Sequence, residues 1–150
     1  MNVGDTAPDF SLPDGKGNEW HLADHKGKVV VLMFYPGDDT PVCTKEMCSV
    51  RDHWSDYQAT GAEVVGISTD SVESHDKFSA KYELPLTLLS DSEGKVRDLY
   101  GAKSILPGRT GRGEFVIDPQ GKISYQKVRP IGLFRPSDND VLAAIKAAQA

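Results

Sequence analysis

The chain has few cysteines and no long apolar segment. Only two of its 150 residues are cysteine, Cys43 and Cys48, whereas small secreted domains that depend on disulfides use more cysteines at wider spacings. No apolar run approaches the roughly 20 residues of a membrane span. The stretch Met1–Phe10 lacks the basic cluster that opens a signal peptide. We therefore expect a cytoplasmic protein with no membrane partner.

Positive charge is also in short supply. The 17 Lys and Arg residues are outnumbered by 22 Asp and Glu residues, which gives a formal net charge of −5. Nucleic-acid binding needs a clustered basic face, so this class of function is excluded. The chain also lacks internal repeats and low-complexity tracts. Its length and near-average composition predict one globular domain covering residues 1–150.

Apolar runs predict the strands of a central sheet. Val29–Tyr35 is an unbroken apolar run, typical of a strand that is buried on both faces. Ala62–Ser68 and Leu86–Leu89 predict two further strands. Glu114–Asp118 and Lys122–Val128 flank a Pro-Gln-Gly turn and predict an antiparallel hairpin. Short crossovers between the earlier strands require those strands to be parallel.

Periodic apolar residues predict helices between these strands. In the first helix, Thr40 is the N-cap, Pro41 is the first helical residue, and an apolar stripe continues to about Gln58. The other predicted segments are helices at Ser71–Tyr82, Gly94–Tyr100 and Asp138–Ala148, and an N-terminal hairpin at Asp9–Leu12 and Glu19–Leu22. This order predicts an α/β, thioredoxin-like fold: a mixed central sheet with helices on both faces and an N-terminal β-hairpin extension.

Cys43 lies in the first turn of the predicted helix. Unpaired backbone N–H groups and the positive end of the helix dipole favour a thiolate there. The helix follows the end of the central strand, where open α/β sheets place their chemistry. We expect the Thr40 hydroxyl to bond the amide or the sulfur of Cys43. Asp38 and Asp39 would oppose the thiolate, so we expect them to point to solvent.

Cys48 lies five positions further along the same helix. In an ideal helix this spacing gives ~500° of rotation and roughly 8.7 Å between Cα atoms, whereas a disulfide needs less than about 7 Å. Either the two cysteines never bond, or the first helical turns unwind when they do. The helical projection places Cys43 on the buried stripe and Cys48 on the solvent side.

Four other interpretations of the cysteine pair compete with a catalytic one. One is an inert pair, with a buried cysteine beside an incidental surface cysteine. A zinc site needs two more ligands, and the four histidines, His21, His25, His53 and His75, are scattered and are interpreted as surface or packing residues. A disulfide reductase uses Cys-x-x-Cys, which is a different spacing. A non-enzymatic holdase would need a large exposed apolar stripe, and the sequence has none.

The residues around Cys43 match a known pattern. Pro36–Cys43 (PGDDTPVC) fits P-x-x-x-T/S-x-x-C, the pattern of peroxiredoxins, and Thr44–Cys48 (TKEMC) is similar to the continuation in the Q-type class. Asp5–Leu12 (DTAPDFSL) resembles the opening of this family, and Arg112–Asp118 (RGEFVID) resembles the hairpin that delivers its site arginine. The chain therefore resembles, over nearly its whole length, a peroxiredoxin of the bacterioferritin-comigratory-protein (Q-type) class.

The resemblance implies a thiol peroxidase and a role for each site residue. Cys43 would be the peroxidatic nucleophile, and Thr40 would hydrogen-bond its thiolate and the attacked peroxide. Arg112 would hold the thiolate and polarise the O–O bond. Pro36 would shield the sulfur from water, and Glu46 would orient the arginine.

The resemblance also implies the rest of the catalytic cycle. Cys48 would resolve the sulfenic acid as an intramolecular disulfide, and thioredoxin, or alternatively glutaredoxin, would restore both thiols. The reaction would need no cofactor and no metal. Because both cysteines belong to one chain, a monomer is expected. Arg109 is a second arginine in the same loop as Arg112, and we interpret it as a surface charge.

Overall fold

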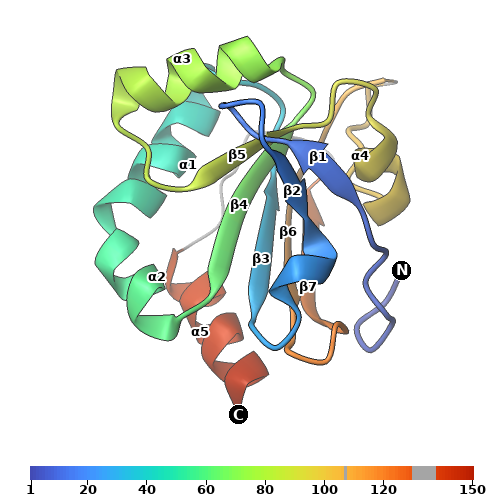
Figure 1. Ribbon diagram of the computed structural model, residues 1–150. Helices are drawn as coiled ribbons and strands as arrows, with labels where there is room; N and C mark the ends of the chain where they lie inside the picture. Colours follow the sequence, from blue (N-terminus) through green and yellow to red (C-terminus); the bar gives the residue numbers. More distant parts are fainter. Residues whose placement is uncertain (107, 130–137) are drawn as a thin grey trace.

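The computed structural model describes residues 1–106, 108–129 and 138–150. Five strands form the main sheet in the order β5-β4-β3-β6-β7 (Figure 1). They are β3 (Val30–Phe34), β4 (Glu63–Ser68), β5 (Thr87–Ser90), β6 (Arg112–Ile117) and β7 (Ile123–Arg129). The first three are parallel, whereas β6 is antiparallel to β3 and β7 is antiparallel to β6. The predicted mixed sheet is confirmed.

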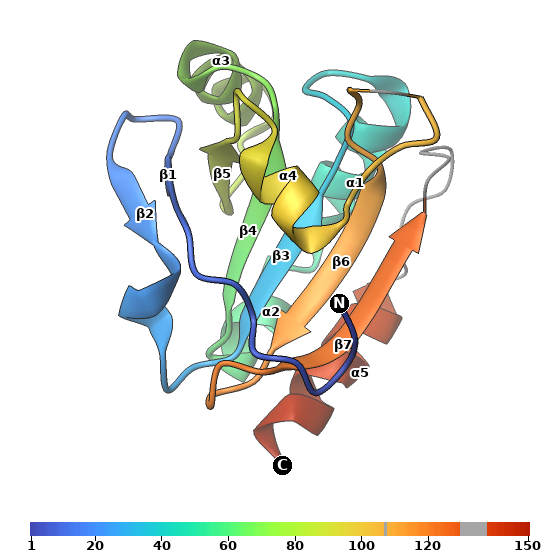
Figure 2. The ribbon, with the colours of Figure 1, turned by 90° about the vertical axis from the view of Figure 1, so that its right-hand side faces the viewer.

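Both faces of this sheet are covered. Apolar side chains place four helices on one face: α1 (Pro41–Asp52), α2 (Trp54–Thr60), α3 (Val72–Tyr82) and α5 (Asp138–Gln149). The opposite face carries α4 (Lys95–Tyr100), a 3-10 helix (Leu22–His25) and the hairpin of β1 (Ser11–Pro13) and β2 (Glu19–His21). Figure 2 shows the hairpin and α4 lying on the side of the sheet away from α1 and α5. The predicted N-terminal hairpin is therefore present.

Strand β3 is central because its side chains serve both cores. Every residue of Val29–Tyr35 is buried. Because side chains alternate along a strand, Val31, Met33 and Tyr35 contact the α1 side, whereas Val30, Leu32 and Phe34 contact the α4 side. An apolar run of this kind is what a strand inside a three-layer structure requires.

The predicted first helix differs from the observed one. A single helix to about Gln58 is wrong, because the helix is interrupted at His53 (φ −105°, ψ 16°) and resumes as α2. At the interruption, the His53 ring nitrogen Nδ1 forms a 2.8 Å hydrogen bond with the Ser49 carbonyl. Strand β6 also begins at Arg112 and not at Glu114, which places Arg112 inside the sheet. In the described part of the chain, no helix is both long and apolar enough to cross a membrane.

Candidate active site

Cys43 sits in the first turn of α1, the helix that follows β3 in the chain. Thr40 has the extended backbone of an N-cap (φ −84°, ψ 152°), and Pro41 follows as the first helical residue. The Thr44 N–H donates to the Thr40 carbonyl at 2.8 Å and closes the first helical turn. Cys43 is 1% exposed. A sulfur in this place is close to amide groups that the helix leaves unpaired.

Arg112 reaches Cys43 from the neighbouring strand. It is the first residue of β6, it is 0% exposed, and its Nη2 donates to the Cys43 Sγ at 3.1 Å. Its Nη1 forms an ion pair with Oε1 of Glu46, which lies one helical turn beyond Cys43. The guanidinium fork therefore binds the sulfur and the carboxylate together, a geometry that suits arginine. A cation in contact with a buried sulfur favours its thiolate form.

A second buried ion pair lies behind the first one. Glu114, two residues after Arg112 on β6, is fully buried and bonded to Arg129 of β7. Alternation along β6 puts Arg112 and Glu114 on the same face, toward α1 and α5. The two carboxylates and two guanidinium groups balance in formal charge. Replacing either arginine by a neutral residue would leave a buried carboxylate without its ion-pair partner, which is destabilising.

Burial changes the acidity of both carboxyl groups. It raises the pKa of Glu46 to about 7, although Arg112 opposes the shift, and the nearby Glu114 charge adds to it. Burial also raises the pKa of Glu114, against the opposing effect of Arg129. Oε2 of each carboxyl group has no hydrogen-bond partner in the described part of the chain. Near neutral pH, therefore, Glu46 exchanges its proton while it remains against the arginine that contacts Cys43.

Two expectations about the loop before α1 are wrong. The Thr40 hydroxyl bonds neither the Cys43 amide nor its sulfur, because it turns back and donates to the Gly37 carbonyl at 3.2 Å. Asp38 does not point to solvent. Its side chain is 4% exposed and is held in a polar network on the far side of the loop. Asp39 is exposed, as expected, and pairs with Lys81.

Cys48 is on α1 but away from the Arg112 cluster. Both cysteines are free, and Cys48 is half-buried where the sequence suggested a solvent-facing position. One turn further on, the Arg51 guanidinium donates to the Tyr82 carbonyl of α3 at 2.7 Å. Because α1 is continuous across both cysteines, the roughly 8.7 Å helical separation applies. A Cys43–Cys48 bond therefore requires α1 to unwind.

The remaining candidate residues occupy separate positions. Pro36 is half-buried two residues after the end of β3, and Arg109 is exposed in the loop before β6. The structure thus brings together Cys43, Arg112 and Glu46, with Thr40 at the start of the same helix. Among the residues in 1–106, 108–129 and 138–150, no three His, Cys, Asp or Glu side chains are grouped in a way that could hold a metal ion.

The sequence did not reveal the Glu114–Arg129 pair. A signal was nevertheless present, since Glu114 is an acid inside an otherwise apolar strand (EFVI) and stands two residues from Arg112. Acids are almost never fully buried without a partner. The sequence could not identify that partner. Arg129 becomes a neighbour of Glu114 only through the strand pairing, in which Glu114 lies opposite Lys127 of β7, two residues before Arg129.

Comparison with known proteins agrees with this geometry. The pattern of the AhpC/TSA family matches residues 3–126. The chain belongs to this family. Among its curated relatives, chloroplastic peroxiredoxin Q of Sedum lineare is 50% identical over 124 residues, which cover 82% of this chain and 67% of that protein. A Coxiella burnetii protein designated peroxiredoxin bcp is 47% identical over 141 residues, covering 88% and 93% of the two chains.

Solved structures place this AhpC/TSA-family chain in the same group. Peroxidoxin BcpB of Mycobacterium tuberculosis superposes with a TM-score of 0.87 at 37% identity, covering 98% of this chain and 97% of that one. A cysteine-to-serine mutant of Xylella fastidiosa PrxQ gives 0.88 at 28% identity, covering 100% and 98%. The predicted thioredoxin-like fold and the resemblance to the Q-type class are therefore confirmed. The chain spans only 58% of a wheat peroxiredoxin Q that is 48% identical to it.

Proposed function

We propose that this chain is a thiol peroxidase in which Cys43 attacks hydrogen peroxide and organic hydroperoxides. One observation carries the proposal: a buried guanidinium donates at 3.1 Å to a buried sulfur in the first turn of a helix. Both the cation and the helix start favour the thiolate, which is the nucleophilic form. Membership of the AhpC/TSA family supports the same chemistry.

The first step transfers one oxygen atom to Cys43. The thiolate sulfur attacks one peroxide oxygen, the O–O bond breaks, and the other oxygen leaves with the bonding electron pair. That oxygen takes up a proton to give water or an alcohol, and Cys43 becomes a sulfenic acid. Arg112 stabilises the charge that moves onto the leaving oxygen. The Thr40 hydroxyl can rotate from Gly37 toward the bound peroxide, while Pro36 shields the sulfur from water.

The second step uses Cys48 as the resolving cysteine. The first turns of α1 unwind, the Cys48 sulfur attacks the Cys43 sulfur, and the sulfenic oxygen leaves as water, so that a disulfide forms. A dithiol protein, thioredoxin or alternatively glutaredoxin, then reduces the disulfide to two thiols and is itself oxidised. Because one chain supplies both cysteines, a monomer completes the cycle. Antioxidant defence is the cellular role that this activity serves.

Peroxide turnover coupled to thioredoxin tests the proposal. The native chain should consume peroxide continuously while reductant lasts, and Cys43→Ser should consume none. Cys48→Ser should consume about one equivalent and then stop, because its sulfenic acid has no resolving partner. A parallel series with glutaredoxin identifies the reductant.

Each variant has a distinct result that would refute its assigned role. Normal turnover by Cys43→Ser would refute the nucleophile. Continuous turnover by Cys48→Ser with thioredoxin would refute the resolving role but leave the peroxidatic role of Cys43 intact.

A further inference from the structure

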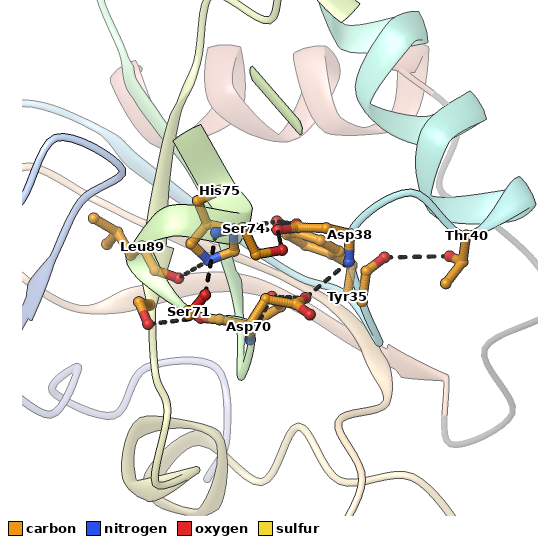
Figure 3. Close-up of polar contacts among 11 residues, drawn as sticks. Tyr35, Asp38, Thr40, Asp70, Ser71, Ser74, His75 and Leu89 are labelled. Carbon is orange, nitrogen blue, oxygen red and sulfur yellow. Dashed lines mark hydrogen bonds and ion pairs between the residues drawn. The ribbon is translucent and has the colours of Figure 1, made fainter. Parts of the chain in front are cut away.

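The loop that leads from β3 into α1 is fastened to α3. Asp38 lies in this loop two residues before the N-cap, and its carboxylate is buried. It accepts three hydrogen bonds, from the Tyr35 hydroxyl at 2.7 Å, from the Ser74 hydroxyl at 2.7 Å, and from His75 Nδ1 at 2.8 Å. Figure 3 shows Ser74 and His75 converging on Asp38, while Thr40 lies on the other side. The carboxylate is therefore fully engaged by neighbouring side chains.

His75 is the most constrained member of this network. It is 0% exposed, and its two ring nitrogens face acceptors on opposite sides, Asp38 Oδ2 at 2.8 Å and the Leu89 carbonyl at 2.9 Å. A carbonyl only accepts, so Nε2 carries a proton. The second hydrogen bond of the ring joins Nδ1 to Asp38 Oδ2. His75 therefore ties Asp38 to the backbone of β5.

The same loop is fixed at two more points. The Asp38 backbone N–H donates to Asp70 Oδ2 at 2.8 Å, and Asp70 also accepts from Ser68 at the end of β4. Asp39 has a left-handed backbone (φ 58°), which is uncommon for any residue other than glycine. Lys81 and Tyr82 of α3 hold its carboxylate at 2.8 and 2.7 Å. Such a conformation persists only where the surroundings enforce it.

These contacts act on the reactive helix through a short covalent path. Asp38 and Asp39 directly precede Thr40, whose carbonyl accepts the first α1 hydrogen bond. Thr40 in turn sets the start of the turn that carries Cys43. A shift of the loop would move the sulfur relative to Arg112, which is fixed independently in β6. The catalytic geometry therefore depends on two separate anchors.

We propose that His75 is a positioning residue for Cys43. His75 acts through Asp38, by holding in place the loop that leads into α1. This inference rests on the proposed function. It assigns a role to a histidine that the sequence alone suggested to be ordinary packing. Burial and the Asp38 charge hold the pKa of Tyr35 well above its ordinary value, so the Tyr35 hydroxyl remains a donor to Asp38 and completes the lock.

Single-turnover kinetics in a Cys48→Ser background test the proposal without any reductant. The variants are His75→Leu, which removes both donors, and His75→Gln, which keeps an amide N–H for Asp38. Ile145→Ala on α5 is the control, since Ile145 is buried in the same core and, being apolar, makes none of the side-chain hydrogen bonds that fasten the loop. All chains are assayed well below their melting temperatures. The measured quantity is the second-order rate constant for consumption of the first equivalent of hydrogen peroxide.

His75→Leu should react about tenfold or more slowly, because a small misplacement of a reacting group is costly. His75→Gln should recover to within about threefold of the parent, and Ile145→Ala should match the parent. If His75→Leu does not fold, Ser74→Ala replaces it and should react about threefold more slowly, because it removes one donor to Asp38.

The possible failures are distinguishable. A parent Cys48→Ser chain that consumes no peroxide refutes the proposed function, and this inference with it. If the parent reacts normally and His75→Leu, or Ser74→Ala in its place, reacts at the same rate, only the role of His75 is overturned. An equal loss in Ile145→Ala and His75→Leu would also overturn it, because general destabilisation would then explain both.

Discussion

Two functions converge on the Arg112 side chain. One nitrogen of its guanidinium group contacts the Cys43 sulfur, and another contacts the Glu46 carboxylate. Lysine has a single ammonium group on a flexible stem and cannot reproduce this planar fork. An arginine at position 112 can therefore hold its cation against the sulfur and the carboxylate at once, whereas a lysine cannot.

Arg112→Lys should keep the protein folded but slow its reaction with peroxide. The charge that balances Glu46 remains, whereas the directed donor to the sulfur and to the leaving oxygen is lost. We expect a decrease of about 100-fold in the single-turnover rate constant. Arg109→Lys is the matched control and should leave the rate unchanged, because Arg109 is exposed. Equal rates for Arg112→Lys and the native chain would contradict this assignment.

Glu46 should make folding stability depend on pH. Burial raises its pKa from an ordinary value of 4.5 to about 7, so between these values the folded chain holds a proton that the unfolded chain has released. The stabilisation is complete below pH 4.5 and is lost as the pH rises through 7. The predicted loss from this group is on the order of 3 kcal/mol.

Urea unfolding of the native chain and Glu46→Gln, at about pH 4.5 and about pH 7.5, measures this effect. The native chain should lose more free energy of unfolding than the variant between the two pH values. Glu114 contributes a fall of the same sign in both chains, since its pKa is also raised, so Glu46→Gln should still lose some stability over this pH range. Identical pH dependence in both chains would contradict the prediction.

At the scale of elements, α1 is where the sequence was most informative and also where it failed. Thr40 and Pro41 correctly predicted its start, because capping depends on local residue types. The interruption at His53 was missed, because the apolar stripe continues in register from Val50 to Trp54. A one-residue change of backbone torsion leaves the periodicity of buried positions intact, so periodicity could not reveal it.

Oxidation should unwind the first part of α1. If Cys43 and Cys48 form a disulfide, the amides of residues 44–50 should exchange with solvent much faster in the peroxide-treated chain than in the reduced chain. The amides of β3 and α5 should keep their protection, because only the start of α1 has to open. Hydrogen exchange with mass spectrometry measures this. Full protection of α1 after oxidation would argue against an intramolecular disulfide.

Gly66 of β4 leaves room for side chains that lie beside it from neighbouring parts of the sheet. A Cβ at this position would lie 2.8 Å from Leu88 Cδ2 and 3.2 Å from Tyr35 Cε1. Gly66→Ala should therefore lower the free energy of unfolding by about 1–3 kcal/mol. Gly113→Ala is the control, because a Cβ there meets nothing closer than 3.5 Å. Denaturant unfolding compares the two, and equal stabilities would contradict this account of the packing.

At the scale of the whole molecule, the sheet could be predicted and the buried charges could not. The apolar run at Val29–Tyr35 fixed the central strand, and the short crossovers fixed its parallel neighbours. By contrast, the Arg112–Glu46, Glu114–Arg129 and Asp38–His75 pairs join residues that are distant in sequence. Their charges follow no periodic pattern, and only the folded sheet brings them together. Resemblance to the family, in Arg112–Asp118 and around Cys43, supplied Arg112 and its partner Glu46, but it did not supply the Glu114–Arg129 and Asp38–His75 pairs.

The central claim is that the sulfur held by Arg112 is the atom that peroxide oxidises. The most direct measurement is mass spectrometry of the reduced Cys48→Ser chain after one equivalent of hydrogen peroxide, with a reagent that traps sulfenic acids. We predict one trapped adduct, on Cys43, and none in Cys43→Ser. An unmodified Cys43 in a chain that has consumed the peroxide would contradict the account.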